Sequence, residues 1–151
     1  MKLGFPVAAR YADYIPQFPK QKRTKAQQQG ISFERAVQKR LASIYGRVEI
    51  GPWLYFQTPK RSGICQPDAL VWLTDEHLCI VEVKLSWMGP ARKKLLEFYG
   101  PIVQAIYPNV TLSYLQIYKN AKTSSHKKPL SIYKLDEIPL NKYKECQWIG
   151  L

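Results

Sequence analysis

The segment from Leu78 to Leu85 constrains the fold of this chain more than any other feature. It reads Leu-Cys-Ile-Val-Glu-Val-Lys-Leu and is apolar at odd and even positions alike, apart from Glu82 and Lys84. A strand that is apolar on both faces belongs in the middle of a covered sheet. Alternate residues of a strand share a face, so the Glu82 and Lys84 side chains point the same way. Because burying an unpaired charge is unfavourable, we expect a paired acid, a metal ion or a bound phosphate beside them.

The residues before this run predict its hairpin partner. Asp68 follows Pro67 at the start of a second strand-like run, and polar residues from Thr74 to His77 supply the turn. We therefore expect Asp68 and Glu82 on adjacent strands. Taken alone, Asp68 is also compatible with an ordinary polar residue at the entrance of a strand.

Pro67-Asp68 and Glu82-Val83-Lys84 form a spaced motif of acids and a lysine. The motif resembles the signature of the PD-(D/E)XK nuclease superfamily, over roughly residues 30–107. The resemblance implies a restriction-endonuclease-like αβββαβ core, a mixed sheet flanked by helices, and hydrolysis of phosphodiester bonds with Mg²⁺ or Mn²⁺. It also implies that Asp68, Glu82 and the peptide carbonyl of Val83 hold the metal.

A third acid, Glu34, belongs to a predicted helix over residues 31–45, in which Phe33, Val37 and Leu41 recur at helical spacing. Helical geometry places Glu34 at the edge of the apolar face. It resembles the helix acid of the superfamily, a direct or water-mediated metal ligand. Lys84 is expected to orient the attacking water and stabilise developing negative charge. The alternatives are a surface helix acid for Glu34 and a salt bridge between Glu82 and Lys84.

The charge of the chain favours a polyanionic partner. Lys and Arg number 23 against 11 Asp and Glu, a net charge of +12. Such a balance suits DNA or RNA, and we expect DNA. Several groups near the motif strands are candidate backbone contacts, with a solvated basic surface as the alternative. These candidate nucleic-acid contacts are Lys60, Arg61, Ser86, Arg92, Lys93, Lys94 and Gln104.

Gln104 and Tyr107 invite comparison with the Gln-x-x-x-Tyr motif of RecB-like members of the superfamily. The spacing here, Gln104-Ala-Ile-Tyr107, is one residue short. A RecB-like exonuclease is therefore not favoured, and Gln104 is kept as a DNA contact or a solvent-facing residue.

The pattern predicts one α/β domain over residues 30–151, preceded by a basic and aromatic arm over residues 1–29. The arm carries Lys20, Lys22, Arg23 and Lys25, which suits phosphate binding or an ordinary flexible terminus. The elements expected after the first helix are a strand over 53–58, a basic turn over 60–63, the two motif strands, a helical region over 91–107 interrupted at Gly100-Pro101, a strand over 110–118 and a short strand over 130–134.

The cysteines and the hydropathy pattern bound the cellular setting. The three cysteines, Cys65, Cys79 and Cys146, lack CxxC spacing and are too few for a four-cysteine iron–sulfur cluster. No apolar run approaches membrane-spanning length, and the first residues lack the apolar core of a signal peptide. We expect a cytoplasmic protein without membrane association.

These features favour a Mg²⁺- or Mn²⁺-dependent deoxyribonuclease in DNA repair, recombination or mobile-element processing, with endonucleolytic action on structured or branched DNA. The alternatives are a non-catalytic basic nucleic-acid-binding module and an exonuclease or RNA-directed nuclease of the same fold. Some members of the superfamily act as symmetric dimers, so a homodimer also stays open.

Overall fold

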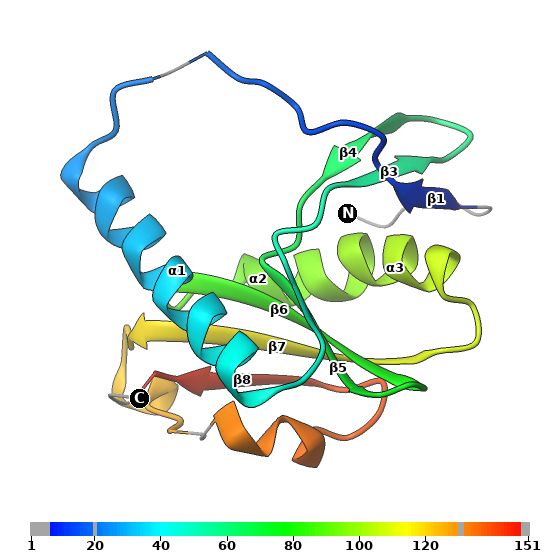
Figure 1. The fold of residues 1–151 in the computed structure, drawn as a ribbon. Coiled ribbons are helices and arrows are strands. Elements are labelled where there is room, and N and C mark those ends of the chain that lie inside the picture. The colour runs from blue at the N-terminus through cyan, green and yellow to red at the C-terminus, as the bar shows by residue number, and fades with distance from the viewer. Residues whose placement is uncertain (1–6, 20, 130–131, 149–151) are drawn as a thin grey trace.

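A mixed five-stranded sheet runs through the middle of the protein (Figure 1). The computed structural model describes residues 7–19, 21–129 and 132–148. The sheet contains, in spatial order, β2 (Val48–Ile50), β5 (Ala69–Thr74), β6 (His77–Ser86), β7 (Thr111–Asn120) and β8 (Tyr143–Gln147). Strand β6 pairs antiparallel with β5 and parallel with β7, so it is central. The prediction of an interior strand from its two apolar faces is confirmed, as is the α/β class.

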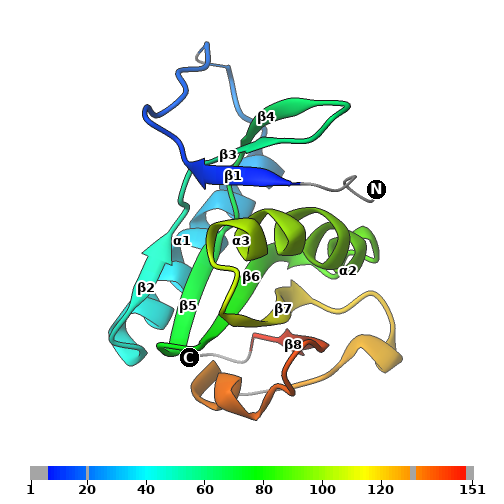
Figure 2. The same ribbon diagram turned by 90° about the vertical axis from the view of Figure 1, so that its right-hand side faces the viewer.

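Helices cover both faces of this sheet (Figure 2). One face packs against α1 (Lys25–Ile44), and the shared core includes Leu41 and Val81. The other face packs against α2 (Pro90–Lys94), η1 (Leu95–Tyr99) and α3 (Gly100–Ile106), with Leu95 beside Ile80 in a second core. Residues of odd and even number on β6 therefore enter different cores.

Helix α1 begins six residues earlier than the apolar pattern predicts. Thr24 caps it: its hydroxyl accepts a hydrogen bond from the Gln27 amide, and the Gln27 side chain accepts one from the Thr24 amide. This reciprocal cap satisfies amides that the helix leaves without partners. In the part of the chain that the structure describes, no helix has the length and apolar character needed to cross a membrane.

A second, three-stranded antiparallel sheet lies beside α3 (Figure 1). Its strands, in spatial order, are β1 (Ala8–Tyr11), β3 (Leu54–Gln57) and β4 (Ser62–Cys65). The strand predicted over 53–58 is thus present as β3, but it is not one of the strands of the main sheet. The strand that pairs with β5 in the main sheet is instead β2, whose three residues are too few to show an alternating apolar pattern.

Two local predictions near this sheet are corrected. Ser62 and Gly63 belong to β4 and not to a turn, because they pair with Gln57 and Phe56. Part of the segment predicted as an arm is a strand, since β1 pairs with β3, and the end of that segment is the first turn of α1. The first correction reflects a tight hairpin between neighbouring strands, and the second reflects the pairing of β1 with a strand far along the chain.

The helical region after β6 continues across Gly100-Pro101. A π-helical turn, η1, lies directly before this pair, and Pro101, which has no amide to donate, marks the irregular place in an otherwise continuous helical stretch. A Cβ at Gly100 would lie 3.0 Å from the Leu95 carbonyl oxygen and 3.0 Å from the Tyr114 hydroxyl. Glycine therefore permits the close approach of this helix to β7.

The chain closes with η3 (Ile132–Glu137), a 3₁₀ segment, and β8. The short strand predicted over 130–134 is wrong for residues 132–134, which begin η3, while residues 130–131 lie outside the described part of the chain. Strand β8 instead comes from Tyr143–Gln147 and pairs parallel with β7.

Candidate active site

Asp68 stands at the start of β5 and is held firmly against β6. The β5–β6 register pairs Ala69 with Val81, which brings Asp68 opposite Glu82. Asp68 Oδ2 accepts a 2.6 Å hydrogen bond from the Val83 amide. Its carbonyl oxygen accepts hydrogen bonds from the Gly51 amide at 3.0 Å and from Gln38 Nε2 at 2.8 Å. The carboxylate is therefore fixed beside the end of β6 before any ligand binds.

Glu82 is buried, with 3% of its surface exposed. Its Oε1 lies 3.5 Å from Lys84 Nζ and 3.9 Å from Lys94 Nζ, both within ion-pair distance. Its Oε2 is buried and has no hydrogen-bond partner among the described residues. A buried carboxylate oxygen without a partner is unfavourable, so this atom marks a place where a ligand would be stabilising.

The pKa values of Asp68 and Glu82 are both raised, mainly by burial and in part by nearby carboxylates. Burial raises the pKa of Asp68 to about 6, the hydrogen bond from Val83 opposes this, and the charge of Glu34 adds to it. Burial likewise raises the pKa of Glu82 to about 7, the charge of Asp68 adds to this, and Lys94 and Lys84 oppose it. A cation placed between such carboxylates would stabilise the charged form of both.

Glu34 reaches the same place from α1. Its side chain is half-buried, as its predicted place at the edge of the apolar face requires. Gln38, one turn later, donates from Nε2 to Glu34 Oε1 at 3.2 Å and to the Asp68 carbonyl. Gln38 thus ties α1 to β5, a role that the sequence analysis missed, although the four-residue spacing from Glu34 already put both on one helix face.

The donors present suit a hard cation. Within the described part of the chain, no three His, Cys, Asp or Glu side chains form a ready-made metal site. Mg²⁺ keeps several waters and needs only one or two carboxylates, so Asp68 and Glu82 satisfy its requirement. The buried oxygen of Glu82 without a partner is the feature that fits such an ion. Glu34 and the carbonyl of Val83 are the neighbouring oxygen donors.

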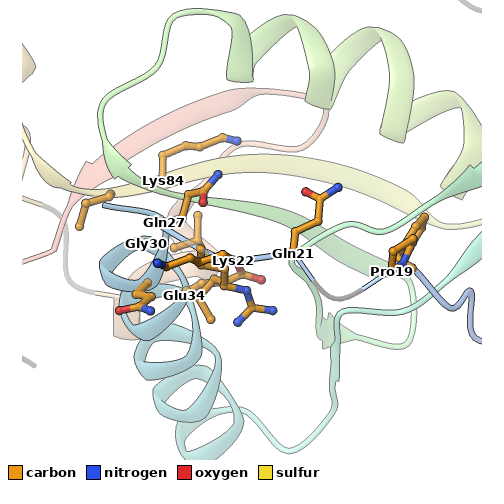
Figure 3. A pocket seen from close by; sticks show the side chains of 13 residues that line it. Pro19, Gln21, Lys22, Gln27, Gly30, Glu34 and Lys84 are labelled. Carbon is orange, nitrogen blue, oxygen red and sulfur yellow. The ribbon is translucent and has the colours of Figure 1, made fainter. Parts of the chain in front are cut away.

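A groove of about 1140 Å³ adjoins these residues (Figure 3). Glu34 and Lys84 line it, while Asp68 and Glu82 lie deeper and do not. Its other walls come from the segment before α1 and from the first turns of that helix. The groove thus adjoins the acids through Lys84, which lines it and pairs with Glu82.

The predicted nucleic-acid contacts separate into near and distant residues. Lys94 comes closest, since its ammonium group pairs with Glu82. Arg92 and Lys93 are exposed on the same short helix, and Ser86 is half-buried at the end of β6. Lys60 and Arg61 lie in the β3–β4 hairpin, where Arg61 stacks over the Phe56 and Phe98 rings.

Gln104 lies away from the acids. Its Nε2 donates to the carbonyls of Tyr107 and Val110, at 2.8 and 2.7 Å, and so closes the end of α3. Val110 leads into β7, whose first residue pairs with His77 at the start of β6. Lys84 is seven residues further along, about 23 Å at strand spacing. The structure therefore gives this amide an internal role and does not place it in the groove.

Comparison with known proteins adds no family to this geometry: no family model, curated protein or solved structure matches the chain.

Proposed function

We propose that the protein is a divalent-metal-dependent deoxyribonuclease. One observation carries the proposal: the buried Glu82 carboxylate lies opposite Asp68 and beside Lys84, and one of its oxygens accepts no hydrogen bond from the described residues. A structural salt bridge needs only one acid, and a second buried carboxylate beside it is unfavourable because the two repel each other. A metal site that binds a phosphate, in contrast, uses two acids to hold the cation.

The bound ion would neutralise charge on the scissile phosphate and supply a reactive water. Asp68 and Glu82 would hold it, and Glu34 would support it directly or through a water. Lys84 would orient the attacking water and stabilise charge on the phosphate oxygens. The Val83 amide and Gln38 hold Asp68 in place, so they are positioning residues.

The topology supports a restriction-endonuclease-like core. Taken in chain order, α1, β2, β5, β6, the α2–α3 region and β7 form an αβββαβ series within one sheet and its covering helices. Strands β3 and β4 enter this series between β2 and β5, and pair with β1 outside the main sheet. The αβββαβ order is the one that the sequence resemblance implies, with the three-stranded sheet as an addition.

The charge of the chain supports a nucleic-acid substrate. The net charge is +12, and the groove beside the acids carries exposed cations. Action on structured or branched DNA in repair, recombination or mobile-element processing, in a reducing cytoplasm, is part of the same proposal. Three buried free cysteines are compatible with that setting.

A non-catalytic DNA-binding module is the second candidate, and one observation favours it. Lys84 and Lys94 both lie within ion-pair distance of Glu82, so its charge is partly compensated without a metal. In that case the acids would hold two lysines in place for phosphate binding.

One experiment separates the two. Labelled single-stranded, duplex, flapped and four-way-junction DNA, and RNA of matched sequence, are incubated with the protein in EDTA, Mg²⁺ or Mn²⁺. Wild type should cut DNA only with a metal, Glu82→Ala and Lys84→Ala should not cut, and the exposed control Lys39→Ala should cut like wild type. Tight DNA binding without cutting under every metal would overturn the nuclease and leave the binding module; preferential cutting of RNA would overturn the choice of DNA.

A further inference from the structure

The segment that joins β1 to α1 forms a strap over the groove. We use this name for residues 12–24, of which residue 20 lies outside the described part of the chain. In Figure 1 the strap arches away from the body between its two ends. At one end β1 is hydrogen-bonded to β3, and at the other Thr24 caps α1.

A latch of side chains strengthens the β1 anchor. The Tyr11 hydroxyl donates to Glu49 Oε1 at 2.5 Å and lies 2.6 Å from the Tyr107 hydroxyl. Glu49 Oε2 accepts a 2.9 Å hydrogen bond from Trp72 Nε1. The latch thus joins β1 to the edge of the main sheet and to the end of α3. The strap therefore starts from a point that is fixed to the body of the protein.

The groove under the strap has three walls. The strap supplies one, the first turns of α1 the second and the end of β6, from Val83 to Leu85, the third (Figure 3). Among the described lining residues, the charged groups are the three cations Lys22, Arg23 and Lys84 and one acid, Glu34. The groove therefore carries a net positive charge, and it borders the acids through Lys84, whose ammonium group pairs with Glu82.

The strap also offers aromatic surface. Phe18 lines the groove with 72% of its surface exposed, and its ring lies 6.2 Å from that of Trp53. Proteins that hold single strands combine exposed aromatic rings, on which the bases stack, with a positively charged groove that contacts the phosphates. A duplex hides its base faces, so it would use the cations alone.

We propose that the groove binds a single-stranded segment of DNA, with the strap across it, and delivers its backbone to the acids. This inference rests on the proposed function, because Glu34 and Lys84 belong both to the groove and to the proposed site. The expected substrate is DNA with an unpaired segment, such as a flap or a free end.

Binding is measured without catalysis, by fluorescence anisotropy in EDTA, with a labelled oligo-dT, its RNA equivalent oligo-U and a hairpin duplex of equal phosphate number. Wild type should bind the oligo-dT about tenfold more tightly than the duplex and at least as tightly as the RNA. Lys22→Gln/Arg23→Gln should weaken binding of the oligo-dT about tenfold, because both cations line the groove. Removing two phosphate contacts should also lower the slope of log Kd against log salt by about 1.4.

A matched control distinguishes the groove from general charge. Arg35→Gln/Lys39→Gln removes two cations from exposed positions on α1, the helix that follows the strap, and neither residue lines the groove. It should leave the affinity for the oligo-dT nearly unchanged, whereas Phe18→Ala should weaken single-strand binding about tenfold and duplex binding little, and so remove the preference for single strands. Equal losses in both double variants, equal affinity for single strand and duplex, or tighter binding of RNA would overturn the inference.

The two proposals fail in different ways. If wild type cuts duplex DNA with Mg²⁺ and the strap variants neither lower its single-strand affinity nor change its cutting, the groove inference fails and the nuclease stands. If the strap variants lose single-strand affinity as expected but no metal supports cutting by wild type, the nuclease fails and the groove remains as a binding site for single strands.

Discussion

Two glutamates, the buried Glu82 on β6 and the half-buried Glu145 on β8, have contrasting surroundings. Glu82 on β6 and Glu145 on β8 are both shielded, with 4% and 13% of their side chains exposed. Both pair with lysines. Yet one oxygen of Glu82 has no hydrogen-bond partner among the described residues, whereas both oxygens of Glu145 are bonded.

Glu145 is the centre of a completed network. Its Oε2 accepts hydrogen bonds from Trp87 Nε1 at 2.9 Å and from the Tyr143 hydroxyl at 3.0 Å, and its Oε1 accepts one from Lys128 Nζ at 2.9 Å. Burial raises its pKa, but the hydrogen bonds from Trp87, Lys128 and Tyr143 outweigh this and hold the pKa below its usual range. The Trp87 ring is also stacked on His126, with 3.7 Å between centroids.

The difference teaches how to tell a structural acid from a candidate catalytic one in this protein. The fold stabilises the charged form of Glu145 fully, so nothing further needs to bind there. It destabilises the charged form of Glu82, whose pKa is raised by burial and by Asp68. An acid that the protein leaves incompletely compensated is a candidate for function.

The largest expected effect separates the two acids by activity. Under the proposed function, Glu82→Gln should lower metal-dependent DNA cleavage at least hundredfold, in the range seen when a charge-stabilising group is removed from an active site. Glu145→Gln should change it less than about threefold, because its partners keep a hydrogen-bond acceptor. Initial rates on the preferred DNA substrate check this, and equal losses in both variants would contradict the contrast between the two acids.

The next effect concerns stability. Glu145→Ala should lower the free energy of unfolding by about 2 kcal/mol, since it leaves the half-buried Trp87 and Tyr143 donors without their acceptor. Glu76→Ala, at an exposed acid in the β5–β6 turn, serves as the control and should change stability by less than about 0.5 kcal/mol. Urea unfolding followed by tryptophan fluorescence measures both, and a loss as small as that of the control would show that the network adds little.

The smallest effect has the opposite sign. Folding raises the pKa of Glu82 from 4.5 to about 7, so the folded state binds the proton more tightly and stability falls as pH rises through this window. Without metal, Glu82→Gln should therefore stabilise the protein by about 1 kcal/mol at pH 8 and little at pH 5. The gain stays small because Lys84 and Lys94 lose their partner in the variant.

Added Mg²⁺ provides the complementary measurement. At pH 8 it should raise the melting temperature of wild type, while at pH 5 protons compete with the ion and the rise should shrink. Glu82→Gln should show little response at either pH. A melting temperature of wild type that is indifferent to Mg²⁺ at pH 8 would count against a metal at this acid.

Much of the central architecture could be predicted from local sequence. The apolar run from Leu78 to Leu85 predicted the interior strand, the helical spacing of Phe33, Val37 and Leu41 predicted α1, and the buried cysteines behave as small apolar residues. The prediction failed where pairing partners are distant. The place of β3 outside the main sheet, the strand β1 and the short β2 all depend on hydrogen bonds to residues far along the chain.

For the candidate site, the sequence named the acids and Lys84, but their environment came from the tertiary structure. It did not indicate that Lys94 reaches Glu82, that Gln38 fixes Asp68 or that Gln104 closes α3. Nor did composition distinguish Glu145 from Glu82, because the distinction lies in whether neighbours from other strands and loops donate hydrogen bonds.

The sequence by itself determined the periodic features of this protein: a central strand, the helix beside it, and acids and a lysine spaced so that a hairpin brings them together. Periodicity acts through neighbours only two to four residues apart, so it can be read directly. The tertiary structure decided which buried charge is compensated, where the strap crosses and which cations line the groove. These depend on the burial and hydrogen bonding of groups that long-range packing brings together, and their energies are set by that environment.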